Sequence, residues 1–234
     1  LGVQSVYYLM AGLYIFALYT NYKLPVLGRI YCGKASIWGD LVDGVRYLAR
    51  QPILLLLLSF GLLRVLLAQP YRTLMPAFAQ EELGFDAGGL GLLLSATAAG
   101  GLVSSLWMSS AGDMRNKGKM LIAGGVLLGL CLLLFGLFRP LPLVMFFLFL
   151  LGVGNMATMV LNNTLIQTHT DAAFRGRVMS VYMMSWGLTP LGTLPAGAIA
   201  DKAGVPLVVG VQGILVVLFM VGMAIVRPEL KRLN

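Results

Sequence analysis

The chain has 234 residues, of which 59% are hydrophobic and only 11% are charged, and its mean hydropathy is +0.87. Soluble domains are about 25% charged, so this composition excludes an ordinary water-soluble globular protein. Apolar runs of about 20 residues, the length that crosses a bilayer core as a helix, recur along the whole chain. The sequence therefore predicts an all-α polytopic membrane protein.

The formal charge of +8 comes from 17 basic and 9 acidic residues. A nucleic-acid partner would require basic residues clustered on one folded surface, whereas here they lie mainly in short segments between apolar runs. Cys32 and Cys131 have no CxxC spacing and no further ligand nearby, so we predict no disulfide framework, no metal and no cofactor. The chain also lacks a nucleophile–base constellation and a phosphate-binding loop, and we expect no enzyme activity and no nucleic-acid partner.

Seven apolar runs are predicted to span the membrane: 1–19, 52–75, 87–110, 120–138, 143–168, 178–200 and 205–226. The first run has no basic segment before it and no small-residue cleavage site after it, which argues against a signal peptide. We expect instead that the sequence begins inside a membrane helix of a longer protein.

Basic residues predict the orientation of the spans, since cytoplasmic loops retain an excess of Lys and Arg. The segments after the first, third, fifth and seventh runs carry thirteen of the seventeen, while Glu81, Glu82 and Asp86 make one opposite loop acidic. We therefore expect the first run to start outside, residues 20–51 to form a cytoplasmic linker and residues 227–234 to form a cytoplasmic tail.

The linker contains a predicted amphipathic helix in the stretch "SIWGDLVDGVRYLARQ", residues 36–51. Helical periodicity places four apolar residues on one face, with the charged residues mostly elsewhere; the four are Ile37, Leu41, Val45 and Leu48. We expect this helix to lie along the inner leaflet or against the cytoplasmic ends of the bundle.

An internal repeat relates two parts of the chain. Asp113 follows the third run and Asp201 follows the sixth. Each comes after a helix rich in small residues and before Lys, Gly and a Gly-containing helix. Runs two to four and five to seven are therefore predicted to be related three-helix units. An odd number of spans separates them, so the units are inverted in the membrane, a pattern of secondary transporters.

Three stretches carry a resemblance to a known family: "LMPAFAQEELGFDAGGLGLLLSATAAGGLVSSL", "GDMRNKGK" and "LIQTHTDAAFRGRVMSVYMMSWGLTPLGTLPAGAIAD". They resemble the C-terminal half of a major facilitator superfamily transporter, in the branch of the enterobactin exporter and related drug and siderophore efflux carriers. The middle stretch departs from the family pattern Gly-x-x-x-Asp-Arg-x-Gly-Arg-Arg at Ser109, Met114 and Asn116.

The resemblance implies two six-helix bundles with the substrate path between them. Residues 1–19 would be helix six, the last helix of a missing N-terminal bundle, and residues 52–226 would form the C-terminal six-helix bundle. It also implies a small-molecule substrate, with the bilayer and the missing bundle of the same polypeptide as partners.

Arg64 lies inside the leucine-rich stretch "LLLLLSFGLLRVLLAQPYR", near the middle of a bilayer core. Gly61, Ala68 and Tyr71 share its helical face, and leucines lie opposite. Because an unpaired cation at that depth is costly, we expect the arginine to face the bundle interior. The residues leave open whether it contacts substrate or bonds structurally to other helices.

Two sets of candidate site residues follow. The substrate cavity is predicted to contain Arg64, Tyr71, Asn155, Asn162 and Thr189, with interhelical hydrogen bonding as the alternative role of the asparagines. The resemblance suggests a conformational switch in which Asp113 pairs with Arg175 or Arg177; the predicted switch set is Asp113, Arg115, Lys117, Arg175, Arg177 and Pro190.

The predicted function is export of small amphipathic molecules such as drugs or siderophores, coupled to an ion. No acidic residue lies inside any predicted span, so in a proton-driven carrier the protonated group would lie in the other bundle or, against expectation, be His169. A retinal protein is disfavoured because the last run lacks a lysine. A membrane sensor or scaffold without transport remains the alternative.

Overall fold

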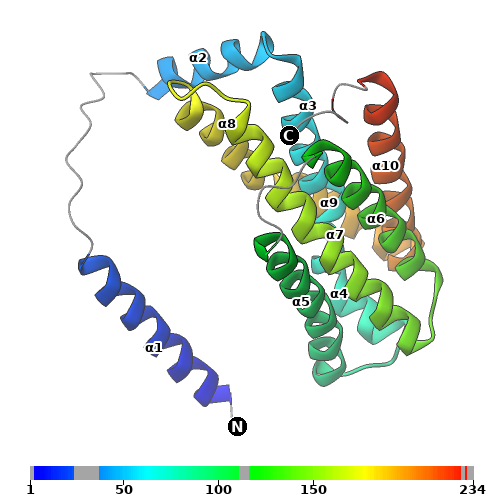
Figure 1. The fold of residues 1–234 in the computed structure, drawn as a ribbon. Coiled ribbons are helices and arrows are strands. Elements are labelled where there is room, and N and C mark those ends of the chain that lie inside the picture. The colour runs from blue at the N-terminus through cyan, green and yellow to red at the C-terminus, as the bar shows by residue number, and fades with distance from the viewer. Residues whose placement is uncertain (1–2, 24–36, 111–115, 228–229, 231–234) are drawn as a thin grey trace. The chain divides into compact units, whose positions relative to one another are not determined.

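The computed structural model describes residues 3–23, 37–110, 116–227 and 230, and across these ranges it contains helices and no strand (Figure 1). The chain divides into two compact units, residues 1–36 and residues 37–234. The first unit holds one 20-residue helix, α1 (Val3–Tyr22), which ends three residues beyond the predicted run. Its apolar side chains are exposed, among them Leu13, Ile15 and Phe16.

The second unit is a helical bundle whose members follow the predicted runs closely. They are α2 (Ile37–Ala49), α3 (Pro52–Leu63), η1 (Arg64–Ala68), α4 (Pro70–Glu81), α5 (Ala87–Ser110), α6 (Lys117–Leu137), α7 (Leu141–Thr168), α8 (Arg175–Gly187), α9 (Thr189–Ala203) and α10 (Val205–Val226). The segment η1 is a π-helix, and it joins α3 to α4 in one 30-residue helical stretch, Pro52–Glu81.

Five helical stretches within the described residues are long and apolar enough to cross a membrane, which makes this an integral membrane protein. They are Pro52–Glu81, Ala87–Ser110, Lys117–Leu137, Leu141–Thr168 and Val205–Val226. The second and last of these have the predicted bounds, and the others differ from prediction by six residues or fewer at either end. The total of seven spans stays a prediction.

The predicted span over residues 178–200 is divided into two helices, because α8 ends at Gly187 and α9 begins at Thr189. Pro190 has no N–H to donate to the carbonyl of Trp186 four residues earlier. The Thr189 hydroxyl donates to that carbonyl oxygen instead, at 2.6 Å. A side chain thus satisfies the acceptor that the proline leaves, and the α-helix is interrupted at Leu188.

Glycines bring the long helices of the bundle into close contact. The most extensive helix pairs are α6–α10, α5–α7 and α6–α7. A Cβ at Gly152 of α7 would overlap the Thr97 carbonyl oxygen of α5, and one at Gly213 of α10 would lie 2.5 Å from the Gly129 carbonyl oxygen of α6. Backbones therefore meet directly at these crossings, as is common for membrane helices. Cys131 packs as an ordinary buried side chain in this core, and Cys32 lies outside the described residues.

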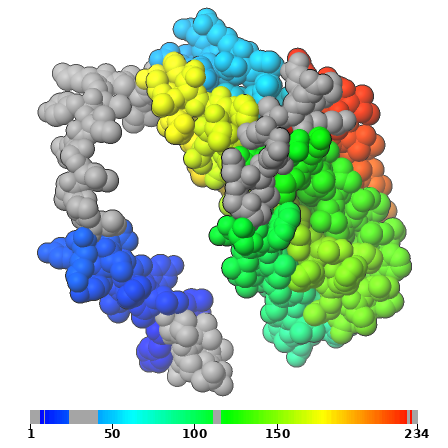
Figure 2. Space-filling view, viewed as in Figure 1, coloured from blue at the N-terminus to red at the C-terminus, as the bar shows by residue number. Residues whose placement is uncertain are grey.

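The amphipathic helix α2 packs against α3 and α8 (Figures 1 and 2). The Tyr47 ring stacks on Phe174 with centroids 4.4 Å apart, and the Tyr47 hydroxyl donates to an Asp171 carboxylate oxygen at 3.0 Å. Leu48 is buried in the adjoining core. Of the two predicted locations for this helix, its contacts favour the ends of the bundle helices.

A salt bridge connects the loop after α4 to the loop before α7. Nε of Arg139, just before α7, lies 2.9 Å from a carboxylate oxygen of Glu82, just after α4. The guanidinium also lies over the Phe78 ring, 5.7 Å from its centroid. These two loops therefore lie on the same side of the bundle, as the charge pattern predicted, although which side of the membrane that is stays a prediction.

Candidate functional site

The candidate site is built around a π-helical turn in the middle of the Pro52–Glu81 stretch. Pro70 has no N–H to donate to the Leu66 carbonyl, so the regular α-helical ladder is interrupted there. Upstream, the Gln69 N–H bonds to the Arg64 carbonyl five residues back, at 3.1 Å, the spacing of a π-helix. Arg64 is the first residue of this turn.

Arg64 points into the bundle and is only 1% exposed. It is the thirteenth residue of the stretch, so it lies about 18 Å from the start at 1.5 Å per residue. Its helical neighbours Gly61, Ala68 and Tyr71 are also buried, whereas Leu55 on the opposite face is 43% exposed. The predicted burial of the arginine face is confirmed, whereas of the leucines predicted opposite it Leu55 is exposed and Leu58, Leu62 and Leu66 are half-buried.

The guanidinium has an incomplete set of partners. Its Nη1 donates to the Asn155 Oδ1 of α7 at 2.9 Å, and its carbon lies 5.1 Å from the centroid of the Trp186 ring of α8. Among the described residues, its Nε and Nη2 form no hydrogen bond of regular geometry, although the Tyr182 side chain interacts with the guanidinium. A buried cation with unpaired donors is energetically unfavourable, so this arrangement is suited to an added acceptor.

Asn162 lies near the same face, two helical turns beyond Asn155 along α7. A Cβ at Gly61 would meet the Asn162 Nδ2 at 3.2 Å and the Tyr182 Cε2 at 2.7 Å, so the missing side chain at Gly61 admits both groups. Asn162 is fully buried, and neither polar atom of its amide has a partner among the described residues. The site therefore holds buried, unpaired donors and an acceptor on two helices.

The other two predicted cavity residues, Tyr71 and Thr189, form no hydrogen bond with the guanidinium. Tyr71 is 1% exposed and its hydroxyl has no partner within the described part of the chain. Thr189 reaches the site only indirectly, because it bonds to the backbone of Trp186. The structure thus brings Arg64 and Asn155 into direct contact, while Asn162 lies against Gly61 of the arginine helix and Thr189 bonds to Trp186.

Sequence reasoning missed Trp186, Tyr182 and the π-helical turn. Pro70, inside an apolar run, was the available signal for an irregular turn, since prolines disrupt the ladder in membrane helices. For the two aromatic residues no sequence signal existed, because aromatic residues are frequent throughout the apolar runs.

The predicted switch residues are only partly described. Asp113 and Arg115 lie outside the described residues, so the expected pairing of Asp113 with Arg175 or Arg177 stays a prediction. Arg177 lies near α2, with Nη1 4.0 Å from an Asp43 oxygen and the guanidinium 5.5 Å from the Phe174 ring centroid.

Three further switch residues are placed at helix beginnings. Arg175 is exposed at the start of α8, and Pro190 is exposed at the second position of α9. Lys117 begins α6 and borders a small cavity of about 260 Å³ with Ser105 of α5 and Thr164 of α7. Pro190 thus lies at the break between α8 and α9, as a hinge residue would.

Comparison with protein families decides the class of the chain. The profile of the Major Facilitator Superfamily matches residues 1–189 and 53–234, which together cover the sequence. The chain belongs to the Major Facilitator Superfamily. The family consists of membrane transporters, in agreement with the buried polar cluster inside membrane-spanning helices.

Curated relatives in the Major Facilitator Superfamily are distant but cover much of the chain. An uncharacterised transporter of the superfamily from Bacillus subtilis, YvqJ, is 26% identical over 94% of this chain and 52% of its own length. The multidrug efflux pump Tap of Mycolicibacterium fortuitum is 25% identical over 72% of this chain and 41% of its own. The staphyloferrin A transporter of Staphylococcus aureus is 24% identical over 69% and 40%. The chain spans about half the length, or less, of these relatives.

Proposed function

We propose that this chain forms one wall of the transport path in a secondary exporter of small amphipathic molecules, coupled to an ion gradient. Membership in the Major Facilitator Superfamily supports transport. Relatives named as a multidrug efflux pump and a staphyloferrin A transporter support small molecules of the drug and siderophore type. The other wall would come from a further bundle of the same polypeptide, since the matched relatives are about twice as long.

Arg64 is the observation that carries the proposal at the level of residues. A positive charge near mid-membrane costs about 2.5 to 3.5 kcal/mol even on lenient insertion scales, and here two of its nitrogens form no hydrogen bond of regular geometry among the described residues. A substrate carboxylate, hydroxamate or carbonyl would satisfy these donors. The proposed substrates therefore carry negative charge or strong hydrogen-bond acceptors.

Access to the arginine would depend on two partly exposed neighbours. Asn155 and Trp186 are half-buried whereas Arg64 is covered. We propose that movement of α8 at the break beside Thr189 and Pro190 uncovers the guanidinium. The Tyr71 hydroxyl and the Asn162 amide would then be further hydrogen-bonding groups of the same polar site.

The switch would operate at the end of the bundle where α2 packs. Asp113, Arg115, Lys117, Arg175 and Arg177 are proposed to form and release ion pairs there as the carrier changes between its two access states. The proton or ion site itself would lie in the other bundle, since the predicted spans contain no acidic residue.

The helix contacts support an inverted repeat as the architecture. If the Pro52–Glu81 stretch corresponds to α7, α5 to α8–α9, and α6 to α10, then the pair α5–α7 corresponds to α9–η1, and the pair α6–α7 corresponds to α10–η1. All four pairs are in contact.

We propose seven spans in total, with the C-terminus in the cytoplasm. A cysteine introduced beside Lys231 should then resist external labelling in intact cells, and efficient labelling would refute the orientation.

Transport by the full-length protein in proteoliposomes tests the function. Arg64→Ala should abolish or strongly reduce export while insertion and folded yield are retained, and Arg64→Lys should rescue it partly, because lysine keeps the charge but loses the planar fork. A structural arginine would instead lose folded yield in Arg64→Ala. Absence of any flux with the wild-type protein would favour the sensor or scaffold alternative.

The isolated 234-residue chain provides a second test. A path with one wall should not carry out selective transport, so no substrate-specific flux is expected from this chain alone. Substrate-specific flux from it would contradict the proposal that a second bundle is required.

A further inference from the structure

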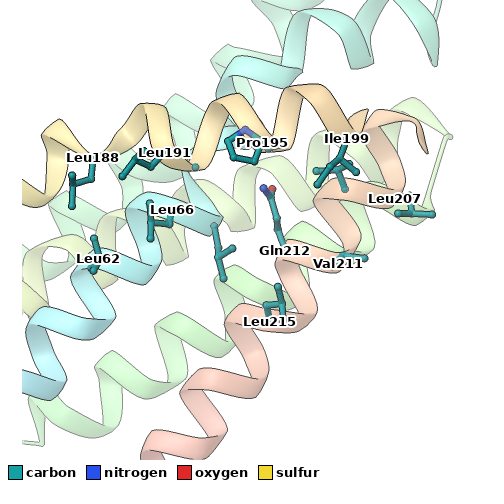
Figure 3. A pocket seen from close by; sticks show the side chains of 14 residues that line it. Leu62, Leu66, Leu188, Leu191, Pro195, Ile199, Leu207, Val211, Gln212 and Leu215 are labelled. Carbon is teal, nitrogen blue, oxygen red and sulfur yellow. The ribbon is translucent and has the colours of Figure 1, made fainter. Parts of the chain in front are cut away.

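A groove on the bundle lies apart from the Arg64 cluster, between η1, α9 and α10 (Figure 3). Its volume is about 580 Å³, within the range of about 300–1,000 Å³ typical of small-molecule sites. Leucines of η1 and α9 line one part and valines of α10 another. Two of the three elements belong to stretches long and apolar enough to span the membrane, so the groove lies within the apolar part of the bundle.

Gln212 is the polar exception in this apolar lining. Its side chain is 6% exposed, and its Oε1 is buried without a hydrogen-bond partner among the described residues. Figure 3 shows the amide pointing from α10 toward Pro195 of α9, across the groove. A buried amide oxygen without a partner is costly, and a ligand group that donates to it would remove that cost.

Pro195 adds an acceptor on the opposite side. It is inside α9 and has no N–H, so the carbonyl of Leu191, which also lines the groove, loses its usual helical donor. The groove therefore has apolar walls, one unpartnered amide oxygen, and a lining residue whose carbonyl has lost its helical donor. Both oxygens are acceptors, and a hydroxyl, which can donate one hydrogen bond, can satisfy the Gln212 Oε1.

Depth distinguishes between the candidate ligands. Gln212 is the eighth residue of the 22-residue α10, so it lies about 10 Å from the start of that helix. Phospholipid headgroups stay outside a hydrocarbon core of about 30 Å, and their acyl chains would leave the amide unpaired. The matching ligand is lipophilic throughout, with its hydroxyl away from the end of the molecule.

From these features we infer that the groove is a binding site, open to the bilayer, for a lipophilic molecule that carries an internal hydroxyl. Gln212 binds the hydroxyl, and the leucines and valines of the walls bind the apolar body. The site is separate from the Arg64 cluster, and the inference does not rest on the proposed transport.

Photolabelling of the full-length protein in lipid nanodiscs tests the site. The probe is a long-chain hydrocarbon with a mid-chain hydroxyl and a diazirine, and its methyl ether is the matched control because it cannot donate. We expect the alcohol to label peptides of residues 189–226 about three- to tenfold more than the ether does, the range of one net hydrogen bond.

Two variants and one control locate the effect. Gln212→Leu should reduce labelling by the alcohol to the level of the ether, whereas Gln69→Leu should not, since Gln69 also has an unpartnered Oε1 but lies outside the groove lining. Val211→Phe should reduce labelling by both probes by filling the groove. Thermal unfolding of each variant checks that it is folded.

Several outcomes would overturn the site. Equal labelling by alcohol and ether in the wild type would show that Gln212 does not select a hydroxyl, as would a preference that survives in folded Gln212→Leu. Failure of both probes to label the groove would show that another protein segment covers it.

Discussion

The Arg64 Nη1 donates a hydrogen bond of 2.9 Å to the Asn155 Oδ1, joining η1 to α7 across 91 positions of sequence. It is the side-chain hydrogen bond of regular geometry that the described structure provides to this buried guanidinium, whose Nε and Nη2 form none. Asn155 therefore lowers the cost of the buried charge. Because it binds only one nitrogen, the other donors are available to a further acceptor.

Replacing Asn155 with Leu should destabilise the bundle by about 1–3 kcal/mol, the range expected when a buried polar group loses its partner, with charged groups at the upper end. Thermal unfolding in detergent measures the effect. Asn163→Leu is the matched control, since Asn163 lies on the same helix and accepts a bond from Gln167, an exposed neighbour.

Asn155→Asp separates charge from shape at the same position. A carboxylate there would pair with the guanidinium in a charge-assisted bond, so we expect stability equal to or above that of the wild type, together with weaker export of anionic substrates. Unchanged stability in Asn155→Leu would contradict the role assigned to this contact.

Gly152→Ala should destabilise the bundle by about 1–3 kcal/mol, the usual cost of overpacking, because the added methyl would overlap the Thr97 carbonyl oxygen of α5. Gly222→Ala is the control, since nothing lies within 4 Å of a Cβ at that position of α10, and alanine favours a helix. The midpoints of thermal unfolding should therefore move down for Gly152→Ala and stay level or rise for Gly222→Ala. Equal midpoints would argue against a close α5–α7 crossing.

Pro190→Ala should restore an N–H that can donate to the Trp186 carbonyl, favouring one continuous helix in place of α8 and α9. If the break works as a hinge, export should slow by about tenfold or more while the unfolding temperature rises or stays constant. Pro142→Ala is the control, because Pro142 lies in the first turn of α7, where no intrahelical partner is lost. Normal export by Pro190→Ala would show that the break between α8 and α9 is not required for export.

Tyr47→Phe should loosen α2 without releasing it. The phenylalanine keeps the stacking on Phe174 but loses two hydrogen bonds, the one that the hydroxyl donates to the Asp171 carboxylate and the one that it accepts from the Asp171 N–H, each worth about 0.5–1.5 kcal/mol. Tyr47→Ala loses the stacking as well. Hydrogen exchange of residues 42–50 should rise modestly in the first variant and more in the second, and an equal rise in both would assign the attachment to the hydrogen bonds alone.

Sequence periodicity located the spanning helices well because each apolar run ends at residues that leave the bilayer or break a helix. The run 87–110 follows Asp86, and the run 205–226 lies between Gly204 and Arg227. Periodicity also predicted the burial of Arg64, since a cationic side chain in a leucine-rich membrane helix is costly in lipid and favours the bundle interior. These features depend only on neighbouring residues.

The remaining features depend on residues far apart in sequence. A proline inside a membrane run can kink, break or locally rewind a helix, and Pro70 and Pro190 produce different results, a π-helical turn and a break. Asn155 as the partner of Arg64 depends on how α7 packs on η1. No local pattern encodes either outcome.

The glycines of α7 indicate that some helices of the bundle are rigidly packed together while others can deform. Gly152 brings α7 against α5, and two residues later Gly154 brings it against α6, where an added Cβ would lie 3.1 Å from the Gly124 carbonyl oxygen. Backbones that touch without intervening side chains have no soft layer in which to slide. The same kind of contact joins α6 to α10 at Gly129 and Gly213. We therefore expect α5, α6, α7 and α10 to move as one rigid block, with deformation concentrated at the helix irregularities beside Pro70 and Pro190.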